Sequence, residues 1–170
     1  MNWQRFSAFL GKADCLERPR DAGCLVAPLA QAFHGGVPVN IKLRDSNGKM
    51  LMDYAKGAFA ETEEEMRRGL EGRSFLRPDE ALLLHYQRDN SGHIGDIMQN
   101  TPQDLDIGWF DSNGKLLEVH PLRKNDPEVT WSKYTDIAYG LEVPRGSFAG
   151  HGAEPGAWLD LSQLRTSISA

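Results

Sequence analysis

The sequence predicts a mainly β, or β-rich α+β, domain: a small barrel-like fold or sandwich of short antiparallel strands with one or two short helices. Two observations favour this fold class. Short apolar runs alternate with turn-forming residues between 37 and 162, as they do in small barrels and sandwiches. In addition, the pentapeptide Asp-Ser-Asn-Gly-Lys occurs at 45–49 and again at 111–115, each time between two apolar runs. An Asn-Gly pair in that position predicts a tight hairpin in which both turn residues tolerate positive φ.

The strands are expected in a simple order along the chain. Val39–Leu43 alternates apolar and polar residues, and the turn after it returns the chain through Met50–Phe59. Ala81–Tyr86 is a short apolar run bounded by turn residues, so it predicts a buried strand. The second Asn-Gly turn joins two more strands. We expect these at 105–110 and 116–119, the last strands at 141–143 and 157–161, and a long surface loop at 121–136.

One helix signal stands out among the strands. Thr62 and Glu65 form a capping-box pattern, and acidic residues follow Thr62 directly. Arg67 and Arg68 then occupy the negative end of the helix dipole, and Gly69 supplies a stop. The sequence therefore predicts a short helix after Thr62.

Residues 1–36 have a different pattern and predict a helical N-terminal arm. Helical spacing places Trp3, Phe6, Phe9 and Leu10 on one face. Such a stripe is buried either on the chain's own domain or on another protein. The chain is thus expected to comprise the arm 1–36, a β-rich domain 37–162 and a C-terminal tail 163–170.

Composition limits the partners and the location. A net charge of −5 and a pI near 5.5 argue against nucleic acid, because phosphate binding depends on clustered Lys and Arg. No apolar run reaches the length of a membrane span, and the first residues lack the pattern of a signal peptide. Cys15 and Cys24 form no CxxC pair, so we expect two reduced thiols. These features predict a cytoplasmic protein or a component of a macromolecular assembly, such as a virus particle.

Three motifs then suggest a family. They are Gly69-Leu70 with Gly72-Arg73, then the turn Asn100-Thr101-Pro102 followed by Leu105-Asp106-Ile107, and finally Tyr139–Gly146. In this order they resemble the signature of the family named domain of unknown function 192, and the resemblance covers Val37–Leu161. It implies a fold and a shared polar cluster, and it discloses no reaction.

The chain also departs from that family's pattern. Asp96 and Ile97 stand where the family tends to have an aromatic residue and Trp, Gln99 replaces Lys, Asp104 replaces Pro, and Glu71 replaces Met. If the family's polar cluster is a working site, the site in this chain differs in charge.

The candidate site consists of Arg73, Asn100, Thr101 and Asp106. A cation, an anion and an amide that converge on a cleft would orient a small polar ligand by hydrogen bonds. The alternative is that Asn100 and Thr101 satisfy local backbone groups at a turn.

A hydrolase is a further alternative. Asp104 and Asp106 are two apart, so if the strand begins as early as Asp104 both carboxylates point to one side of it, about 7 Å apart, which fits paired-carboxylate glycoside chemistry. The family has proline at the first position, however, and a carboxylate can instead accept backbone N–H bonds. No catalytic residue is therefore assigned. The five histidines show no HxH or HExxH spacing, so we predict neither a metal nor another cofactor.

We therefore predict a non-catalytic interaction or structural component of a larger assembly. It would dock on a protein partner through the arm residues Trp3, Phe6, Phe9 and Leu10, without nucleic acid or membrane. The first alternative is a small polar ligand-binding protein that uses Arg73, Asn100, Thr101 and Asp106, and the second is a small hydrolase.

Overall fold

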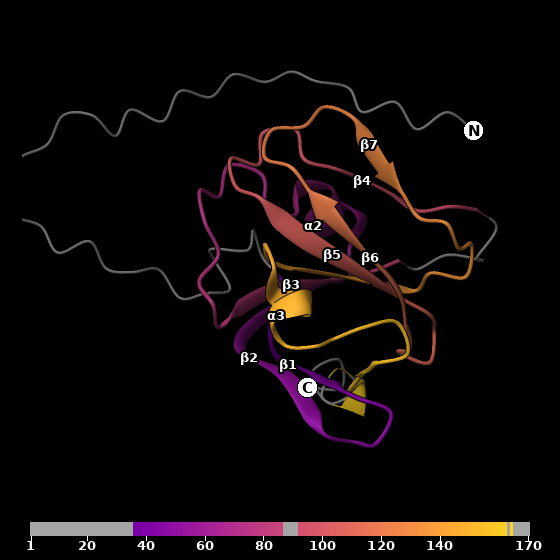
Figure 1. The fold of residues 1–170 in the computed structure, drawn as a ribbon. Helices are drawn as coiled ribbons and strands as arrows, with labels where there is room; N and C mark the ends of the chain where they lie inside the picture. Colours follow the sequence, from indigo (N-terminus) through magenta and orange to yellow (C-terminus); the bar gives the residue numbers. More distant parts are fainter. Residues whose placement is uncertain (1–35, 87–91, 163, 165–170) are drawn as a thin grey trace, which may run out of the picture.

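The computed structural model describes residues 36–86, 92–162 and 164 (Figure 1). The elements in these residues are β1 (Val37–Arg44), β2 (Met50–Ala60), α2 (Glu63–Arg68), β3 (Glu80–His85), β4 (Gly95–Ile97), β5 (Leu105–Phe110), β6 (Leu116–Leu122), β7 (Val129–Trp131), β8 (Tyr139–Pro144), α3 (Ser147–Gly150) and β9 (Trp158–Leu159). The fold is mainly β, which confirms the predicted class. The predicted N-terminal helix lies outside the described residues.

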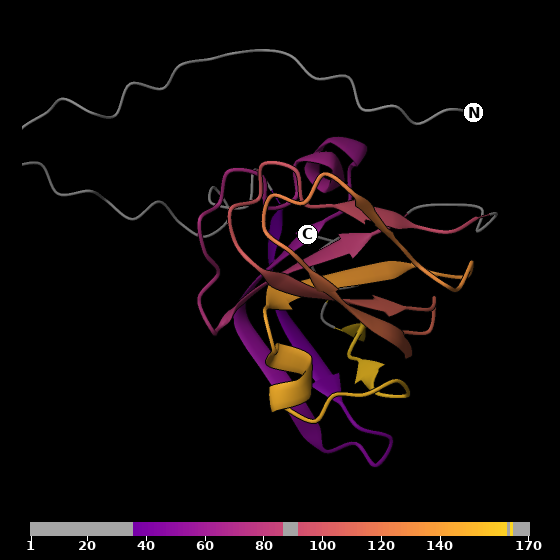
Figure 2. The same ribbon diagram turned by 45° about the horizontal axis from the view of Figure 1, so that its top comes forward.

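The larger sheet curls into a half-barrel (Figure 2). It has seven strands in the order β6-β5-β8-β3-β2-β1-β9. β2 and β3 pair in parallel, with α2 in the connection between them, whereas the other pairs are antiparallel. The short β9 pairs with β1, and a bridge between Trp158 and Lys115 links it to the start of β6. The two edge strands of the sheet, β6 and β9, therefore lie next to each other at the start of β6.

Two apolar cores lie on the two faces of this sheet. The first contains Phe110, Leu141 and Phe148 from β5, β8 and α3. The second contains Leu105, Trp109 and residues from the segments around α2 and β4. All six residues of β5 are buried, because both of its faces are covered. Double burial explains why this strand has a nearly continuous apolar sequence.

The two identical turns join β1 to β2 and β5 to β6, as predicted. In each, the aspartate Oδ1 accepts the backbone N–H groups two and four residues later, all at 2.9 Å. Gly48 has φ +81° and Gly114 has φ +88°, whereas neither asparagine has positive φ. The prediction of positive φ at both turn residues is therefore wrong: the aspartate cap favours a turn in which glycine alone takes the left-handed conformation.

The capping box at α2 is present as predicted. Thr62 Oγ1 accepts the Glu65 N–H at 3.2 Å, and Glu65 Oε2 accepts the Thr62 N–H at 3.0 Å. Arg68 forms an i,i+4 ion pair with Glu64 at 2.7 Å. The helix ends at Gly69, which has positive φ.

The expected loop at 121–136 is partly strand. β6 continues through Pro121, and β7 pairs with β4 in a separate two-stranded sheet. Proline is tolerated in β6 because this strand is at the edge of the sheet, where a missing N–H breaks no ladder bond. The glycine-rich stretch before β9 also contains α3, which the sequence analysis did not predict.

Candidate functional site

A small polar cavity lies where β4, β5 and β8 meet the segment around α2. Its volume is about 20 Å³, enough for one group of the size of a water molecule. It is lined by Met66, Arg67, Arg68, Gly69, Leu70, Glu71, Asp96, Ile97, Met98, Thr101, Leu105 and Glu142. Three carboxylates, two arginines and a threonine hydroxyl thus stand beside apolar walls.

Glu142 reaches the cavity from the middle of the sheet. Its strand, β8, lies between β3 and β5, and Glu142 pairs with Leu82 on one side and Ile107 on the other. The residue is only 5% exposed. A carboxylate at this depth is costly to bury unless charged or hydrogen-bonding groups compensate for lost water, so its position requires a polar environment.

Asp96 and Tyr86, which are both half-buried, add to this polar environment. Asp96 on β4 accepts the N–H of Ile97 through Oδ1 at 2.9 Å. Burial raises the pKa of the Tyr86 phenol well above its ordinary value, and the charges of Asp96 and Glu142 raise it further. The Tyr86 hydroxyl therefore stays protonated near two carboxylates.

Thr101 and Asn100 are placed by the turn that follows β4. The Thr101 N–H donates to the Met98 carbonyl at 2.9 Å, and Thr101 is 5% exposed. Asn100 has φ +62° and donates through Nδ2 to Glu71 Oε1 at 2.8 Å. Its carbonyl accepts the Gly72 N–H at 2.7 Å. Asn100 therefore holds the Glu71 carboxylate at the cavity and ties two distant segments together.

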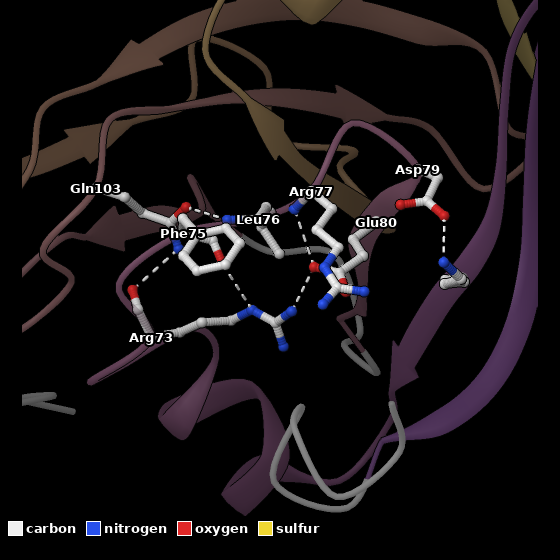
Figure 3. A network of polar contacts seen from close by, with 8 residues as sticks. Arg73, Phe75, Leu76, Arg77, Asp79, Glu80 and Gln103 are labelled. Atoms are coloured by element: carbon white, nitrogen blue, oxygen red, sulfur yellow. Dashed lines mark hydrogen bonds and ion pairs between the residues drawn. The ribbon is translucent and has the colours of Figure 1, made fainter. Parts of the chain in front are cut away.

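Arg73 does not line this cavity and takes part in a separate polar network (Figure 3). Its Nε donates to the Phe75 carbonyl at 3.1 Å, and its guanidinium is paired with Glu80, which is 3% exposed. Gln103 bridges the same loop, since it accepts the Leu76 N–H at 2.6 Å and donates to the Arg73 carbonyl at 3.0 Å. These contacts give Arg73 a structural role: it fixes the loop before β3.

Asp106 lies on the opposite face of β5 from the cavity. Leu105 lines the cavity, and adjacent strand residues point to opposite faces. Asp106 instead accepts the Gly146 N–H at 2.7 Å and lies 3.4 Å from Arg145 Nε. Burial raises its pKa, although the Gly146 N–H and the Arg145 charge act in the opposite direction. Of the four predicted site residues, only Thr101 therefore lines the cavity, whereas Asn100 is linked to it through Glu71.

The two aspartates of the hydrolase alternative are each held by a backbone group. Asp104 precedes β5, is exposed, and accepts the Lys124 N–H at 2.8 Å. Asp106 is held by Gly146. The condition for both carboxylates to share one side, a strand that begins at Asp104, is not met, because β5 begins at Leu105.

Other predicted features have separate outcomes. Trp3, Phe6, Phe9 and Leu10 of the arm lie outside the described residues. In the part of the chain that the structure covers, no three His, Cys, Asp or Glu residues are grouped so that they could hold a metal ion. No helix among the described residues has the length and apolar character needed to cross a membrane.

A second, more open hollow of about 670 Å³ lies at the hairpin tips. It is lined by Arg44, Asn113, Trp158, Leu159, Asp160, Leu161 and Ser162. Arg44 and Asp160 approach to 3.9 Å there. Although this hollow is larger, it is a surface groove with no buried charge, so we place the candidate site at the smaller cavity.

The smaller cavity is where the three sequence motifs meet. Gly69–Glu71 comes from the first motif, Thr101 and Leu105 from the second, and Glu142 from the third. Three positions that depart from the family's pattern, Glu71, Asp96 and Ile97, also line it. Glu142 was not predicted from the sequence because its surroundings read as an ordinary strand, although it lies inside the third motif.

The fold is similar to that of two solved structures. A protein from Sinorhizobium meliloti 1021, described as a candidate transcription regulator, aligns with a TM-score of 0.67 and 22% identity over 74% of this chain and 94% of its own. A protein of unknown function from Novosphingobium aromaticivorans DSM 12444 aligns with a TM-score of 0.66 and 20% identity over 88% of this chain and 99% of its own. At these identities the likeness concerns the fold.

The sequence itself decides the family. No curated protein matches it. The model of the domain of unknown function 192 family, described as "Uncharacterized ACR", matches residues 46–161, which include all three motifs and every residue of the cavity. The chain therefore belongs to the domain of unknown function 192 family.

Proposed function

We propose that this protein is a non-catalytic binding protein whose cavity takes one hydrogen-bond-donating group of a small polar ligand, such as the ammonium group of an amine. The observation that carries the proposal is the convergence of three motifs, distant in sequence, on one cavity that contains Glu71, Asp96 and Glu142. A fold-building role alone would not require carboxylates from three separate segments at one point.

The three carboxylates of the lining outnumber its two arginines, and this excess of negative charge favours a cationic group in the cavity. Asp96 and Glu142 are acceptors when ionised, and Thr101 offers a hydroxyl beside them. A compact cation with several N–H donors matches this set, because hydrogen bonds between ionised partners are stronger than neutral ones. Where the family has Lys and Met, this chain has Gln99 and Glu71, a change that removes a positive charge and adds a negative one.

The size of the cavity limits how much of a ligand enters. A volume of about 20 Å³ admits one water-sized group and excludes a bulky one. The remainder of the ligand would lie at the surface beside Arg67 and Glu71, which are both exposed. We therefore expect a ligand whose polar end is slender. We also expect the protein to bind that head group alone with low affinity.

The test is a titration of the ¹⁵N-labelled full chain with methylammonium chloride, followed by amide chemical shifts. Tetramethylammonium chloride is the matched control, because it has the same charge but is too large for the cavity and has no N–H donors. We expect saturable shifts at Thr101, Asp96 and Gly69 with methylammonium only. Equal responses to the two salts, or no saturable response, would overturn the proposal.

The predicted role as an assembly component, for instance in a virus particle, stays a prediction. It depends on Trp3, Phe6, Phe9 and Leu10, so its test is the oligomeric state of the full chain before and after replacement of these four residues by serine. A smaller sedimenting species in the variant would support docking through the arm, and an unchanged one would count against it.

A further inference from the structure

The two Asp-Ser-Asn-Gly-Lys turns have the same sequence and the same internal hydrogen bonds but different surroundings. Asn47 and Gly48 are both exposed, and a Cβ added at Gly48 would meet nothing within 4 Å. Asn113 is exposed as well, but Gly114 is buried, and a Cβ there would lie 2.8 Å from the Leu159 carbonyl oxygen. The β1–β2 turn projects from the domain (Figure 1, Figure 2), whereas the β5–β6 turn is covered by β9.

An Asn-Gly pair can modify itself without an enzyme. The glycine backbone nitrogen attacks the asparagine side-chain amide carbon, a C–N bond forms, and ammonia leaves as the C–N bond of the side-chain amide breaks. Water then opens the cyclic imide at either carbonyl, which yields aspartate or isoaspartate. Glycine favours the reaction because it has no side chain to hinder the attack and imposes few limits on the backbone.

In the native turns the attacking nitrogen is engaged. The Gly48 N–H donates to the Asp45 carbonyl and the Gly114 N–H to the Asp111 carbonyl, each at 3.0 Å. Attack therefore requires local opening of the turn, and the rate reflects how easily each turn opens.

Opening is harder at the second turn because β9 holds it. The Gly114 carbonyl accepts the Leu159 N–H at 2.7 Å, and the next residues are tied to the same segment, since the Leu116 N–H donates to the Ala157 carbonyl at 2.8 Å. At the first turn, the corresponding Gly48 carbonyl accepts only an exposed side-chain bond from Arg44 Nη1 at 3.1 Å. A backbone bond beneath a covering strand is lost less readily than an exposed side-chain bond.

We propose that Asn47 is a site of spontaneous conversion to aspartate and isoaspartate in the folded protein, and that β9 protects Asn113. The conversion adds a negative charge at the tip of the β1–β2 hairpin, beside Asp45. It also distinguishes two turns that no sequence comparison could separate.

The test is incubation of the full chain at neutral to mildly alkaline pH, followed by proteolysis and mass spectrometry with a fragmentation method that separates aspartate from isoaspartate. We expect Asn47 to react about tenfold faster than Asn113, the factor that one net hydrogen bond supplies. The same chain in concentrated urea is the matched control, because the two identical pentapeptides should then react at similar rates. Equal rates in the folded chain, or faster reaction at Asn113, would overturn the proposal.

A substitution gives an independent check on the site. Asn47→Gln should abolish most of the mass change in the folded protein, whereas Asn113→Gln should leave it nearly unchanged. Conversion to aspartate without isoaspartate would show direct hydrolysis in place of the cyclic imide and would also contradict the proposed step.

Discussion

Replacement of Gly114 by alanine should destabilise the protein much more than replacement of Gly48, although the two glycines occupy the same position in identical turns. Both have φ in the left-handed region, at +88° and +81°, so alanine introduces about 1–2 kcal/mol of backbone strain at either position. At Gly114 the new Cβ would also lie 2.8 Å from the Leu159 carbonyl oxygen and 3.3 Å from Leu161 Cγ. Overpacking of this kind costs about 1–3 kcal/mol more.

The expected loss of unfolding free energy is therefore about 1–2 kcal/mol for Gly48→Ala and about 2–5 kcal/mol for Gly114→Ala. Equilibrium unfolding in urea measures both, and the slope against denaturant should stay constant because the exposed surface hardly changes. Equal losses for the two variants would refute the reasoning, because it attributes the difference to the cover that β9 places over one turn.

The remaining predictions concern the helix cap, the buried ion pair and the tyrosines. Thr62→Ala removes the cap of α2 and should cost about 1 kcal/mol in urea unfolding. Arg73→Ala leaves the Glu80 carboxylate buried without its guanidinium and should cost about 3 kcal/mol or more, and Arg73→Lys should restore only part of it. Burial raises the pKa of Tyr54 to about 12, with a smaller contribution from a nearby aspartate, and burial also raises the pKa of Tyr86 well above its ordinary value. Because the folded state then holds these protons more tightly than the unfolded state, their stabilisation is complete below pH 10 and is lost as the pH rises through 10 to 12. Ultraviolet titration should show at least two of the four tyrosines still protonated at about pH 11.

The parts of the fold that were predictable have local causes. The turn residues define both hairpins, and the capping box defines α2, because each signal involves residues only a few positions apart. β4 was missed since Gly95–Ile97 has no apolar alternation and forms a strand only through its pairing with β7. The parallel pairing of β2 with β3 is likewise a non-local feature.

The candidate site was only partly predictable because it depends on register. The pairing of Ile107 with Glu142 brings the third motif to the second, and no local pattern encodes that pairing. Asp106 was predicted at the site for a related reason. Successive residues of a strand point to opposite faces, so the face on which a side chain lies can be predicted only when the orientation of the strand is known. Of the predicted residues, Thr101 lines the cavity, and the turn that places it is a local feature.

The most direct test of the ligand site is the dissociation constant of methylammonium for Glu142→Gln compared with the native chain, with Glu128→Gln as the control. Glutamine keeps the size of the side chain and removes the charge, and Glu128 is an exposed carboxylate outside the cavity. We predict binding at least about tenfold weaker in Glu142→Gln, since a charged hydrogen bond contributes roughly that factor, and unchanged binding in Glu128→Gln. Equal affinity in the native chain, Glu142→Gln and Glu128→Gln, when the spectrum of each protein shows that it is folded, would contradict the account.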